Sequence, residues 1–205
     1  MEMPKATGTL WIKRAFDIAA SALGMVVLSP LMLAIAAAVR CSSAGPVVFR
    51  QKRLGRGGKP FTIYKFRSMV VNPESETGWA KWDDPRQTRV GAFLRRHNLD
   101  ELPQLFNVLN GTMSLIGPRP ERPYFAARFQ AEIPGYGARL AMRPGMTGFA
   151  QVNGLRGDTS IEKRTECDLW YIENWSLGLD ARIMLKTLFG DIDDDDRTKE
   201  RWDRP

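Results

Sequence analysis

The sequence predicts a mainly helical α+β protein whose first helix is apolar. An uncharged segment of about 22 residues runs from Ile18 to Val39. Two later segments, 47–53 and 61–70, are rich in β-branched and aromatic residues and have glycines between them. Beyond these, apolar residues recur at helical spacing. Together these observations predict an N-terminal membrane helix, a small β-hairpin and several amphipathic helices at the membrane face.

The composition limits the chemistry that the chain can perform. Its 205 residues, 43% of them hydrophobic, suit one domain with a hydrophobic core. The net charge of +7 favours anionic partners, and by itself leaves nucleic acid, phosphorylated small molecules and a membrane surface open. Cys41 and Cys167 have no C-x-x-C spacing, which indicates neither a disulfide framework nor a zinc site. His97 is the only histidine, so catalysis is expected from carboxylates and cations rather than a Ser/His/Asp triad.

The apolar segment is long enough to match the hydrocarbon core of a membrane. Ser29-Pro30 falls near its middle, and we expect a break there because proline removes a backbone donor and clashes with the preceding turn. Basic residues flank both ends of the segment, and positive residues prefer the cytoplasm. A re-entrant helix, which enters and leaves on the same face, satisfies both flanks.

Two other readings of this segment stay open. One is a straight membrane-spanning anchor, and the other is a buried helical hairpin of a soluble protein. A cleaved signal peptide is disfavoured because the apolar run exceeds the roughly 7–15 residues of such a signal and contains a proline.

The hairpin predicted over 47–53 and 61–70 carries many cations. They form either a solvated face or a phosphate-binding surface, and the sequence favours neither interpretation. The following stretch, 72–86, predicts a long loop in which Trp79 and Trp82 are expected at the level of lipid headgroups. The cations of the hairpin are Arg50, Lys52, Arg53, Lys65 and Arg67.

Apolar spacing predicts the later helices. A short helix is expected over 88–96, with a break at 98–100, and another helix is expected to begin after this break, so that Asp100 would lie near its N-cap. Turns rich in glycine and proline cover 114–120 and 144–157. The remaining helices are expected over about 121–132, 161–175 and 180–189.

Asp100 and Glu101 form an acidic pair with unusual neighbours. Such a pair at a helix start is ordinarily a cap that complements the helix dipole. Here Arg95 and Arg96 precede it, and the sequence Gly-Pro-Arg-Pro around Arg119 follows one short helix later. A guanidinium suits phosphate because its planar fork donates two parallel hydrogen bonds.

The surroundings of the pair indicate phosphate chemistry. A carboxylate beside arginines and a helix N-terminus is expected to stay ionised at neutral pH, which suits a nucleophile attacking phosphorus. The pair could equally hold Mg²⁺, which commonly binds through one or two carboxylates plus substrate phosphates. Positioning and charge neutralisation are most of what phosphoryl transfer requires.

Several long motifs then add a resemblance. Residues 98–109 (NLDELPQLFNVL) and 113–120 (MSLIGPRP) resemble the catalytic region of bacterial sugar transferases, the monotopic phosphoglycosyl transferases. Residues 64–69 and 143–154 match further motifs of that family, and the segment broken at Ser29-Pro30 looks like its re-entrant membrane helix. The resemblance spans about residues 12–190, with the motifs in the right order.

The resemblance implies transfer of a sugar phosphate from a UDP-sugar to polyprenyl phosphate, in particular undecaprenyl phosphate, with release of UMP. Asp100 would attack the β-phosphate and carry the phosphosugar covalently, while Glu101 would be a Mg²⁺ ligand or a base. Asp168 would play a supporting polar role. The residues expected to bind phosphate or substrate are Arg119, Lys65, Arg95, Arg67, Gln151, Asn153 and Arg156. For Gln151, Asn153, Arg156 and Asp168, a role in stabilising their loops is an equally weighted alternative.

The resemblance also implies an organisation and a location. Residues 1–40 would form the re-entrant helix, 41–190 a catalytic region of the same domain on the cytoplasmic face of a bacterial inner membrane, and 191–205 a charged tail. Expected partners are a UDP-sugar, polyprenyl phosphate and membrane lipid, with Mg²⁺ as cofactor and without nucleic acid; a homo-oligomer stays open. The product would enter capsule, exopolysaccharide or O-antigen synthesis.

Two other functions are kept as alternatives. A non-catalytic basic protein at the membrane surface would bind anionic lipid or nucleic acid with strong salt dependence. A glycosyltransferase that forms a glycosidic bond would release UDP instead of UMP.

Overall fold

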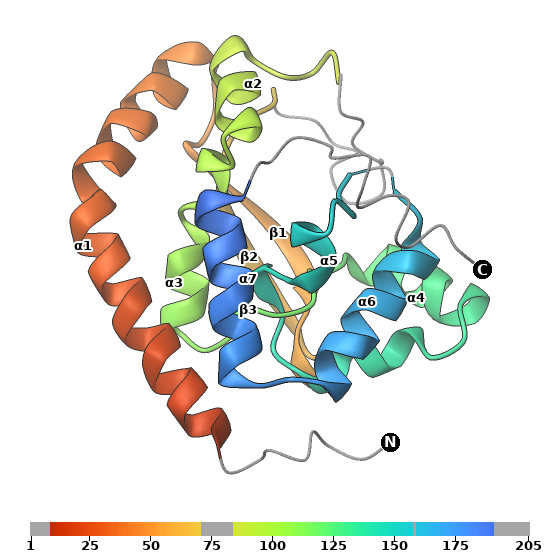
Figure 1. Ribbon diagram of the computed structural model, residues 1–205. Coiled ribbons are helices and arrows are strands. Elements are labelled where there is room, and N and C mark those ends of the chain that lie inside the picture. The colour runs from red at the N-terminus through yellow and green to blue at the C-terminus, as the bar shows by residue number, and fades with distance from the viewer. Residues whose placement is uncertain (1–8, 71–83, 158, 191–205) are drawn as a thin grey trace.

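The computed structural model describes residues 9–70, 84–157 and 159–190 (Figure 1). This part of the chain is mainly helical and contains two small two-stranded sheets, which confirms the predicted mainly helical α+β class. The predicted positions of Trp79 and Trp82 and the predicted charged tail, 191–205, lie outside the described residues.

The helix α1, Leu10–Ser42, runs along one side of the molecule (Figure 1). Within the described residues it is the one helix long and apolar enough to cross a membrane. Only 11% of its apolar window is buried against the rest of the protein. The core helix of a soluble protein would be mostly buried, so this packing disfavours the buried hairpin considered above.

The two faces of α1 reverse the usual pattern of a soluble helix. Its buried residues include Lys13, Asp17 and Ser21. Large apolar side chains point outward instead, and this face suits a lipid environment rather than water. The exposed apolar residues of α1 are Trp11, Ile12, Phe16, Ile18, Leu23, Val26, Val27, Leu31 and Leu33.

The polar inner face ties α1 to the rest of the fold. Lys13 Nζ lies 2.6 Å from Asp180 Oδ2, in a pair whose side chains are about one-tenth exposed or less. Arg14 donates to the carbonyl oxygens of Val108 and Leu109, at 2.6 and 2.9 Å. The backbone N–H of Leu115 donates to Asp17 Oδ1 at 3.1 Å.

The predicted break at Ser29-Pro30 does not divide α1 into two helices. Helical structure continues through Pro30. Proline has no N–H to donate to the carbonyl of Val26, four residues earlier. The Ser29 hydroxyl donates to this same oxygen at 2.8 Å and so replaces the missing bond. In Figure 1, α1 still changes direction about halfway along, as an internal proline would cause.

The predicted hairpin is confirmed. Strands β1, Val48–Leu54, and β2, Pro60–Phe66, pair antiparallel, with Gln51 opposite Ile63. A short 3₁₀ turn, Arg56–Gly58, connects them. On one face of β2, Phe61 and Ile63 are buried in the main core, whereas Phe66 is buried on the other face with Ile35, Val39 and Leu94.

The segment that carries the acidic pair differs from its prediction. Helix α2, Arg89–Arg96, is confirmed, but Asp100 does not lie at the N-cap of an α-helix. It lies inside a 3₁₀ turn, η4, Leu99–Glu101, and α3 spans only Gln104–Leu109. Pro103 has no N–H, so the preceding turn closes through shorter i→i+3 bonds such as Glu101 N to Asn98 O, at 3.2 Å.

A parallel pair of short strands lies in the middle of the molecule. Strand β3, Ser114–Ile116, is fully buried and pairs with β4, Gly145–Thr147. A Cβ atom on Gly145 would lie 2.1 Å from the backbone nitrogen of Gly117, so only glycine allows the two backbones to approach this closely.

The C-terminal helices are confirmed with shifted bounds. The last one begins earlier than expected because the Ser176 hydroxyl accepts from Leu179 N and caps it. The remaining elements are α4, Pro123–Glu132, the 3₁₀ segment η5, Tyr136–Ala141, α5, Phe149–Val152, α6, Ile161–Glu173, and α7, Leu177–Phe189.

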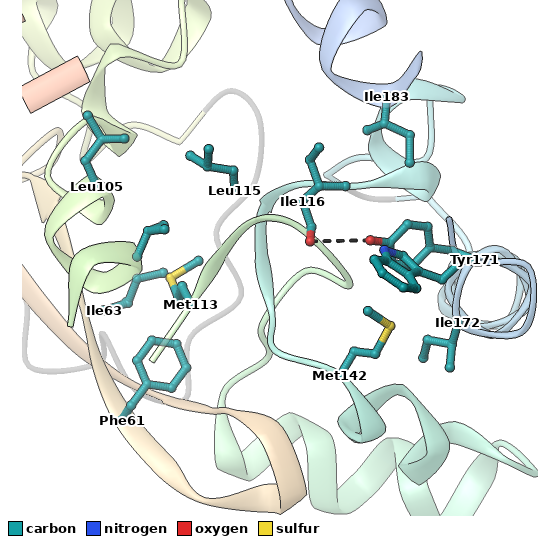
Figure 2. Packing of buried hydrophobic residues seen from close by; sticks show 12 residues of the cluster. Phe61, Ile63, Leu105, Met113, Leu115, Ile116, Met142, Tyr171, Ile172 and Ile183 are labelled. Carbon is teal, nitrogen blue, oxygen red and sulfur yellow. Dashed lines mark hydrogen bonds between the residues drawn. The ribbon is translucent and has the colours of Figure 1, made fainter. Parts of the chain in front are cut away.

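The main hydrophobic core surrounds β3 (Figure 2). Tyr171 from α6 points toward β3, and its hydroxyl oxygen lies 3.5 Å from Ile116 O. Because α3 and β3 both contribute to this core, the acidic pair before α3 and the loop after β3 are held against one rigid body. The buried members are Phe61, Ile63, Leu105, Val108, Met113, Leu115, Ile116, Met142, Tyr171, Ile172, Trp175 and Ile183.

Candidate active site

The turn η4 places two adjacent carboxylates in different surroundings. Asn98, just before it, has a left-handed backbone with φ of 54° and is the only non-glycine residue in the described ranges with positive φ. This reversal turns the chain back from α2 toward β2. Asp100 and Glu101 therefore lie between the basic end of α2 and the basic hairpin.

Glu101 is held between two cations. Lys65 Nζ, from β2, donates to Oε1 at 2.6 Å. Arg119 forks over both oxygens, with Nη2 2.7 Å from Oε1 and Nη1 3.4 Å from Oε2. Burial alone would raise the pKa of Glu101, but Arg119 and Lys65 hold it well below its usual range. Glu101 is therefore a fixed anion.

Asp100 has no comparable partner. The residue is 7% exposed, and no donor in the described part of the chain hydrogen-bonds to its carboxylate. Burial raises the pKa of Asp100, and the neighbouring charge of Glu101 adds to this, whereas Lys65, Arg95 and Arg119 act against it. From the sequence, only the lowering of the Asp100 pKa by the neighbouring cations was predicted. The desolvation that opposes them depends on how deeply the turn is packed.

Arg119 reaches Glu101 from the loop that follows β3. Its side chain is 44% exposed, so one side of the guanidinium remains accessible to a ligand. The backbone of the loop is fixed to β4, since Gly117 N donates to Thr147 O at 2.9 Å. The structure thus brings together Asp100, Glu101, Lys65 and Arg119 from three separate segments.

Arg95 and Arg156 lie at the edges of this cluster. Arg95 contacts Met69 Sδ at 3.8 Å, and its charge lowers the pKa of Asp100. Arg156 donates through Nε to Gln151 O at 2.9 Å. Its pKa is lowered by burial and by the nearby charge of Arg119. Among the described residues, its terminal nitrogens have no hydrogen-bond partner and suit an anionic ligand.

Gln151 and Asn153 serve the backbone of their own loop. Gln151 is 8% exposed and donates through Nε2 to Met146 O at 3.1 Å. Asn153 donates to Phe149 O at 2.8 Å, near the end of α5. These contacts match the loop-stabilising alternative. Gln151 Oε1 is buried and has no hydrogen-bond partner among the described residues.

Arg67 lies elsewhere, contrary to its prediction as a substrate-binding residue. It is 4% exposed and donates to the carbonyl oxygens of Ser43 at 2.7 Å, Pro46 at 2.5 Å and Val39 at 3.2 Å. These carbonyls belong to the C-terminal end of α1 and the chain just after it, where a cation satisfies free acceptors. The sequence could not reveal these hydrogen bonds, because they form between the end of α1 and the residue that follows β2.

Asp168 is 2% exposed and cannot reach a substrate. It pairs with Arg139, whose Nε lies 2.7 Å from Asp168 Oδ2. Its expected supporting role is consistent with this contact. Sequence reasoning did not single out Arg139, because a lone arginine in a glycine-rich stretch carries no recognisable pattern.

The described residues contain no group of three or more His, Cys, Asp or Glu side chains arranged for a metal ion. The adjacent pair Asp100 and Glu101 offers carboxylate oxygens only. Mg²⁺ fits such a pair when substrate phosphates supply further oxygen ligands, which is how Mg²⁺ is commonly bound.

Comparison with known proteins shows the family to which the chain belongs. A family model described as bacterial sugar transferase matches residues 8–192. The chain belongs to the bacterial sugar transferase family. In this bacterial sugar transferase, the matched range includes α1, the acidic pair in η4 and the Arg119 loop, so the family resemblance expected from the motifs is confirmed.

Curated members of the family are similar over most of this chain. A UDP-glucose:undecaprenyl-phosphate glucose-1-phosphate transferase from Escherichia coli is 48% identical over 183 residues, or 87% of this chain and 39% of that protein. A UDP-N-acetylgalactosamine-undecaprenyl-phosphate N-acetylgalactosaminephosphotransferase from Aeromonas hydrophila is 48% identical, covering 87% of this chain and 43% of that protein. An exopolysaccharide production protein PSS from Rhizobium leguminosarum bv. phaseoli is 44% identical, covering 89% and 96%. The chain thus spans about two fifths of the first two relatives.

Proposed function

We propose that this bacterial sugar transferase moves a sugar phosphate from a UDP-sugar to polyprenyl phosphate, in particular undecaprenyl phosphate, and releases UMP. This reaction would be the first membrane step of a polysaccharide or glycoconjugate pathway. The printed names of the Escherichia coli and Aeromonas hydrophila relatives describe such transfers. The observation that carries the proposal is the difference between the two carboxylates: Glu101 binds two cations, whereas Asp100 is buried and has no hydrogen-bond donor among the described residues.

In the first step, a carboxylate oxygen of Asp100 attacks the β-phosphorus of the UDP-sugar. The bond between this phosphorus and the oxygen that bridges the two phosphates breaks, and the oxygen leaves with UMP. The sugar phosphate is then joined to Asp100 as an acyl phosphate. A carboxylate without hydrogen-bond donors suits this attack, because a donor would stabilise its charge and weaken it as a nucleophile.

In the second step, a phosphate oxygen of polyprenyl phosphate attacks the same phosphorus. The Asp100 carboxylate leaves, and the product is a polyprenyl-diphosphate sugar. The attacking phosphate is already ionised near neutral pH, since its second pKa is about 6, so no base is needed. Glu101, with its low pKa, serves better as a partner that orients Lys65 and Arg119 than as a base.

The cations neutralise the phosphates during transfer. Arg119 offers an accessible guanidinium for two parallel hydrogen bonds to phosphate oxygens. Lys65 and Arg95 lie on the side of Asp100, and Arg156 extends the positive surface beyond Arg119. Mg²⁺, held by Asp100 or Glu101 together with diphosphate oxygens, would supply additional charge neutralisation.

We also propose that α1 lies in the inner membrane as a re-entrant helix, with the catalytic residues on the cytoplasmic face. The outward apolar side chains favour burial in lipid, and Lys13, Arg14 and Arg40 flank the apolar segment. The bend seen in Figure 1 would return both ends of α1 to one membrane face. This arrangement brings the site to the level of a lipid phosphate.

The deciding experiment measures UMP release by the detergent-solubilised chain with Mg²⁺, undecaprenyl phosphate and a panel of UDP-sugars. The panel includes UDP-glucose and UDP-N-acetylgalactosamine, the sugars in the relatives' names. We expect Asp100→Asn to reduce turnover about 10³-fold or more, and intact-protein mass spectrometry to detect the phosphosugar adduct only with Asp100. Full activity of Asp100→Asn would refute the covalent mechanism.

The product separates the proposal from its alternatives. Release of UDP instead of UMP would indicate formation of a glycosidic bond. Binding of anionic lipid or nucleic acid that weakens steeply with salt, without any UMP, would indicate a non-catalytic surface protein.

A further inference from the structure

The backbone of the Pro118-Arg119-Pro120 loop is held through three consecutive carbonyl oxygens. Gly145 N, from β4, donates to Pro118 O at 3.0 Å. Arg139 Nη2, from η5, donates to Arg119 O at 3.1 Å. Arg53 Nη1, from β1, donates to Pro120 O at 3.0 Å. Two of the three loop residues are prolines without an N–H, so carbonyls provide most of the means to fix this backbone.

Arg139 is the most firmly anchored of the two side-chain donors. It is 8% exposed, and its guanidinium lies over the ring of Tyr136, 4.8 Å from the centroid. Both Nε and Nη2 contact Asp168 Oδ2, at 2.7 and 2.6 Å. Asp168 belongs to α6, which also supplies Tyr171 to the main core. One guanidinium thus links the core helix α6 to the carbonyl of Arg119.

Arg53 is anchored differently. Its carboxylate partner, Glu121, at 3.2 Å, belongs to the same loop that Arg53 holds. Arg53 therefore connects the loop to the hairpin, whereas Arg139 and Asp168 connect it to α6.

We propose that Arg139, oriented by Asp168, is a positioning residue for Arg119. This inference rests on the function proposed above. Arg139 hydrogen-bonds to neither Asp100 nor Glu101 among the described contacts, so its influence on the reaction passes through the Arg119 backbone. The Arg119 side chain is 44% exposed and is not fixed by packing, and its fork on Glu101 depends on where its backbone lies.

The geometry predicts that a lysine does not fully replace Arg139. A planar guanidinium donates in fixed directions and bridges the carboxylate and the carbonyl at the same time. An ammonium at the end of a flexible chain would keep the charge beside Asp168 but would not hold both acceptors in one plane. A shift of about 1 Å in a substrate-binding group costs roughly 10²-fold in rate.

The test is a kinetic double-mutant cycle on the full chain in detergent, with UMP release as the readout. We expect Arg139→Lys to lower kcat about 10²-fold in the wild-type background. In the Arg119→Ala background, the same change should cost less than about 2-fold, because the group that it positions is gone. Equal losses in both backgrounds would overturn the proposal, and so would an unchanged kcat in Arg139→Lys.

Controls separate positioning from folding. Arg128→Lys changes an exposed arginine on α4 that pairs with Glu132, and it should leave UMP release unchanged. If Arg139→Lys does not fold, Asp168→Asn takes its place in the cycle, with an expected loss of about 10-fold and the same dependence on Arg119.

A second measurement does not depend on activity. Amide hydrogen exchange of the peptide over 114–122 should become faster in Arg139→Lys than in the wild type, and Arg128→Lys should not change it. Unchanged exchange in Arg139→Lys would also overturn the proposal. Absence of UMP release from the wild-type chain would instead refute the proposed function.

Discussion

Asp100 and Glu101 are neighbours in the chain, but they experience opposite electrostatic surroundings. Lys65 and Arg119 bind Glu101 directly, which keeps its pKa low. Asp100 loses water on burial and gains no hydrogen-bond donor among the described residues, so its pKa is raised. Two carboxylates with separated pKa values can take two different roles, one as a fixed charge partner and one as a nucleophile.

This separation predicts the pH dependence of the reaction. The nucleophile must be unprotonated, so kcat/KM for UMP release should fall as the pH drops through the pKa of Asp100. Burial raises this pKa, and the fall should begin at a higher pH than the value of about 3.9 for an ordinary aspartate would give. Lys65 lowers the pKa of Asp100, so Lys65→Met should move the acid limb to still higher pH.

The measurement is kcat/KM for UMP release as a function of pH in both proteins. Arg128→Met removes an exposed positive charge on α4 and serves as the control. An acid limb that stays in place or moves to lower pH in Lys65→Met would contradict the assignment of Asp100 as the group that titrates.

At the scale of an element, α1 combines a lipid-facing surface with one internal proline. The Ser29 hydroxyl donates to Val26 O, the acceptor that Pro30 leaves without a partner. Helical structure therefore continues, while the steric clash of the proline ring remains and favours a bend. Continuity and curvature have separate causes in this helix.

Pro30→Ala should straighten α1. Alanine restores the N–H donor to Val26 O and removes the ring, and 33 residues at about 1.5 Å each exceed the roughly 30 Å of a hydrocarbon core. Cysteines introduced by Lys5→Cys or Ala44→Cys, in a Cys41→Ser background, can be labelled in intact cells with an impermeant reagent.

The re-entrant topology predicts that neither cysteine is labelled from outside in the otherwise native chain. Pro30→Ala should make one of the two accessible. Opposite accessibility of the two positions before the proline is changed would refute the re-entrant arrangement.

At the scale of the whole molecule, polar contacts on the inner face of α1 join the membrane helix to the last helices. The Asp180 carboxylate accepts hydrogen bonds from Lys13 Nζ at 2.6 Å, the Tyr171 hydroxyl at 2.7 Å and Trp175 Nε1 at 3.2 Å. This network connects residues 167 positions apart in sequence. It fixes the base of α1 against α6 and α7, which carry no catalytic residue themselves.

Lys13→Met should therefore destabilise the whole fold. Breaking a buried ion pair commonly costs about 3–5 kcal/mol, and the two hydrogen bonds that remain on Asp180 should reduce this to about 2 kcal/mol. For a chain of this size that corresponds to a fall in Tm of roughly 4–8 °C.

Thermal unfolding in detergent measures this change. Arg128→Met, which breaks an exposed pair on α4, is the matched control and should leave Tm unchanged. An equal Tm for Lys13→Met and the native chain would show that the pair contributes nothing to stability.

Local sequence patterns were enough to predict the class of the fold and the hairpin, and the motifs were enough to predict candidate site residues. Periodicity and turn residues are local properties, so they predicted β1, β2 and most helices. The motif around Asp100 and the Gly-Pro-Arg-Pro loop identified the family because they are long and lie in a fixed order. Lys65 joined them only through the family resemblance, since one cation in a basic hairpin is locally indistinguishable from the next.

Which charged side chains contact one another depends on the packing of distant segments. Lys65 lies on β2 and Arg67 just after its end, yet Arg67 binds carbonyls at the end of α1 and Lys65 binds Glu101. The roles of Asp100 and Glu101, and the link from Asp168 through Arg139 to Arg119, likewise depend on contacts between distant segments. Burial and long-range pairing set these charges, and neither is encoded in local spacing.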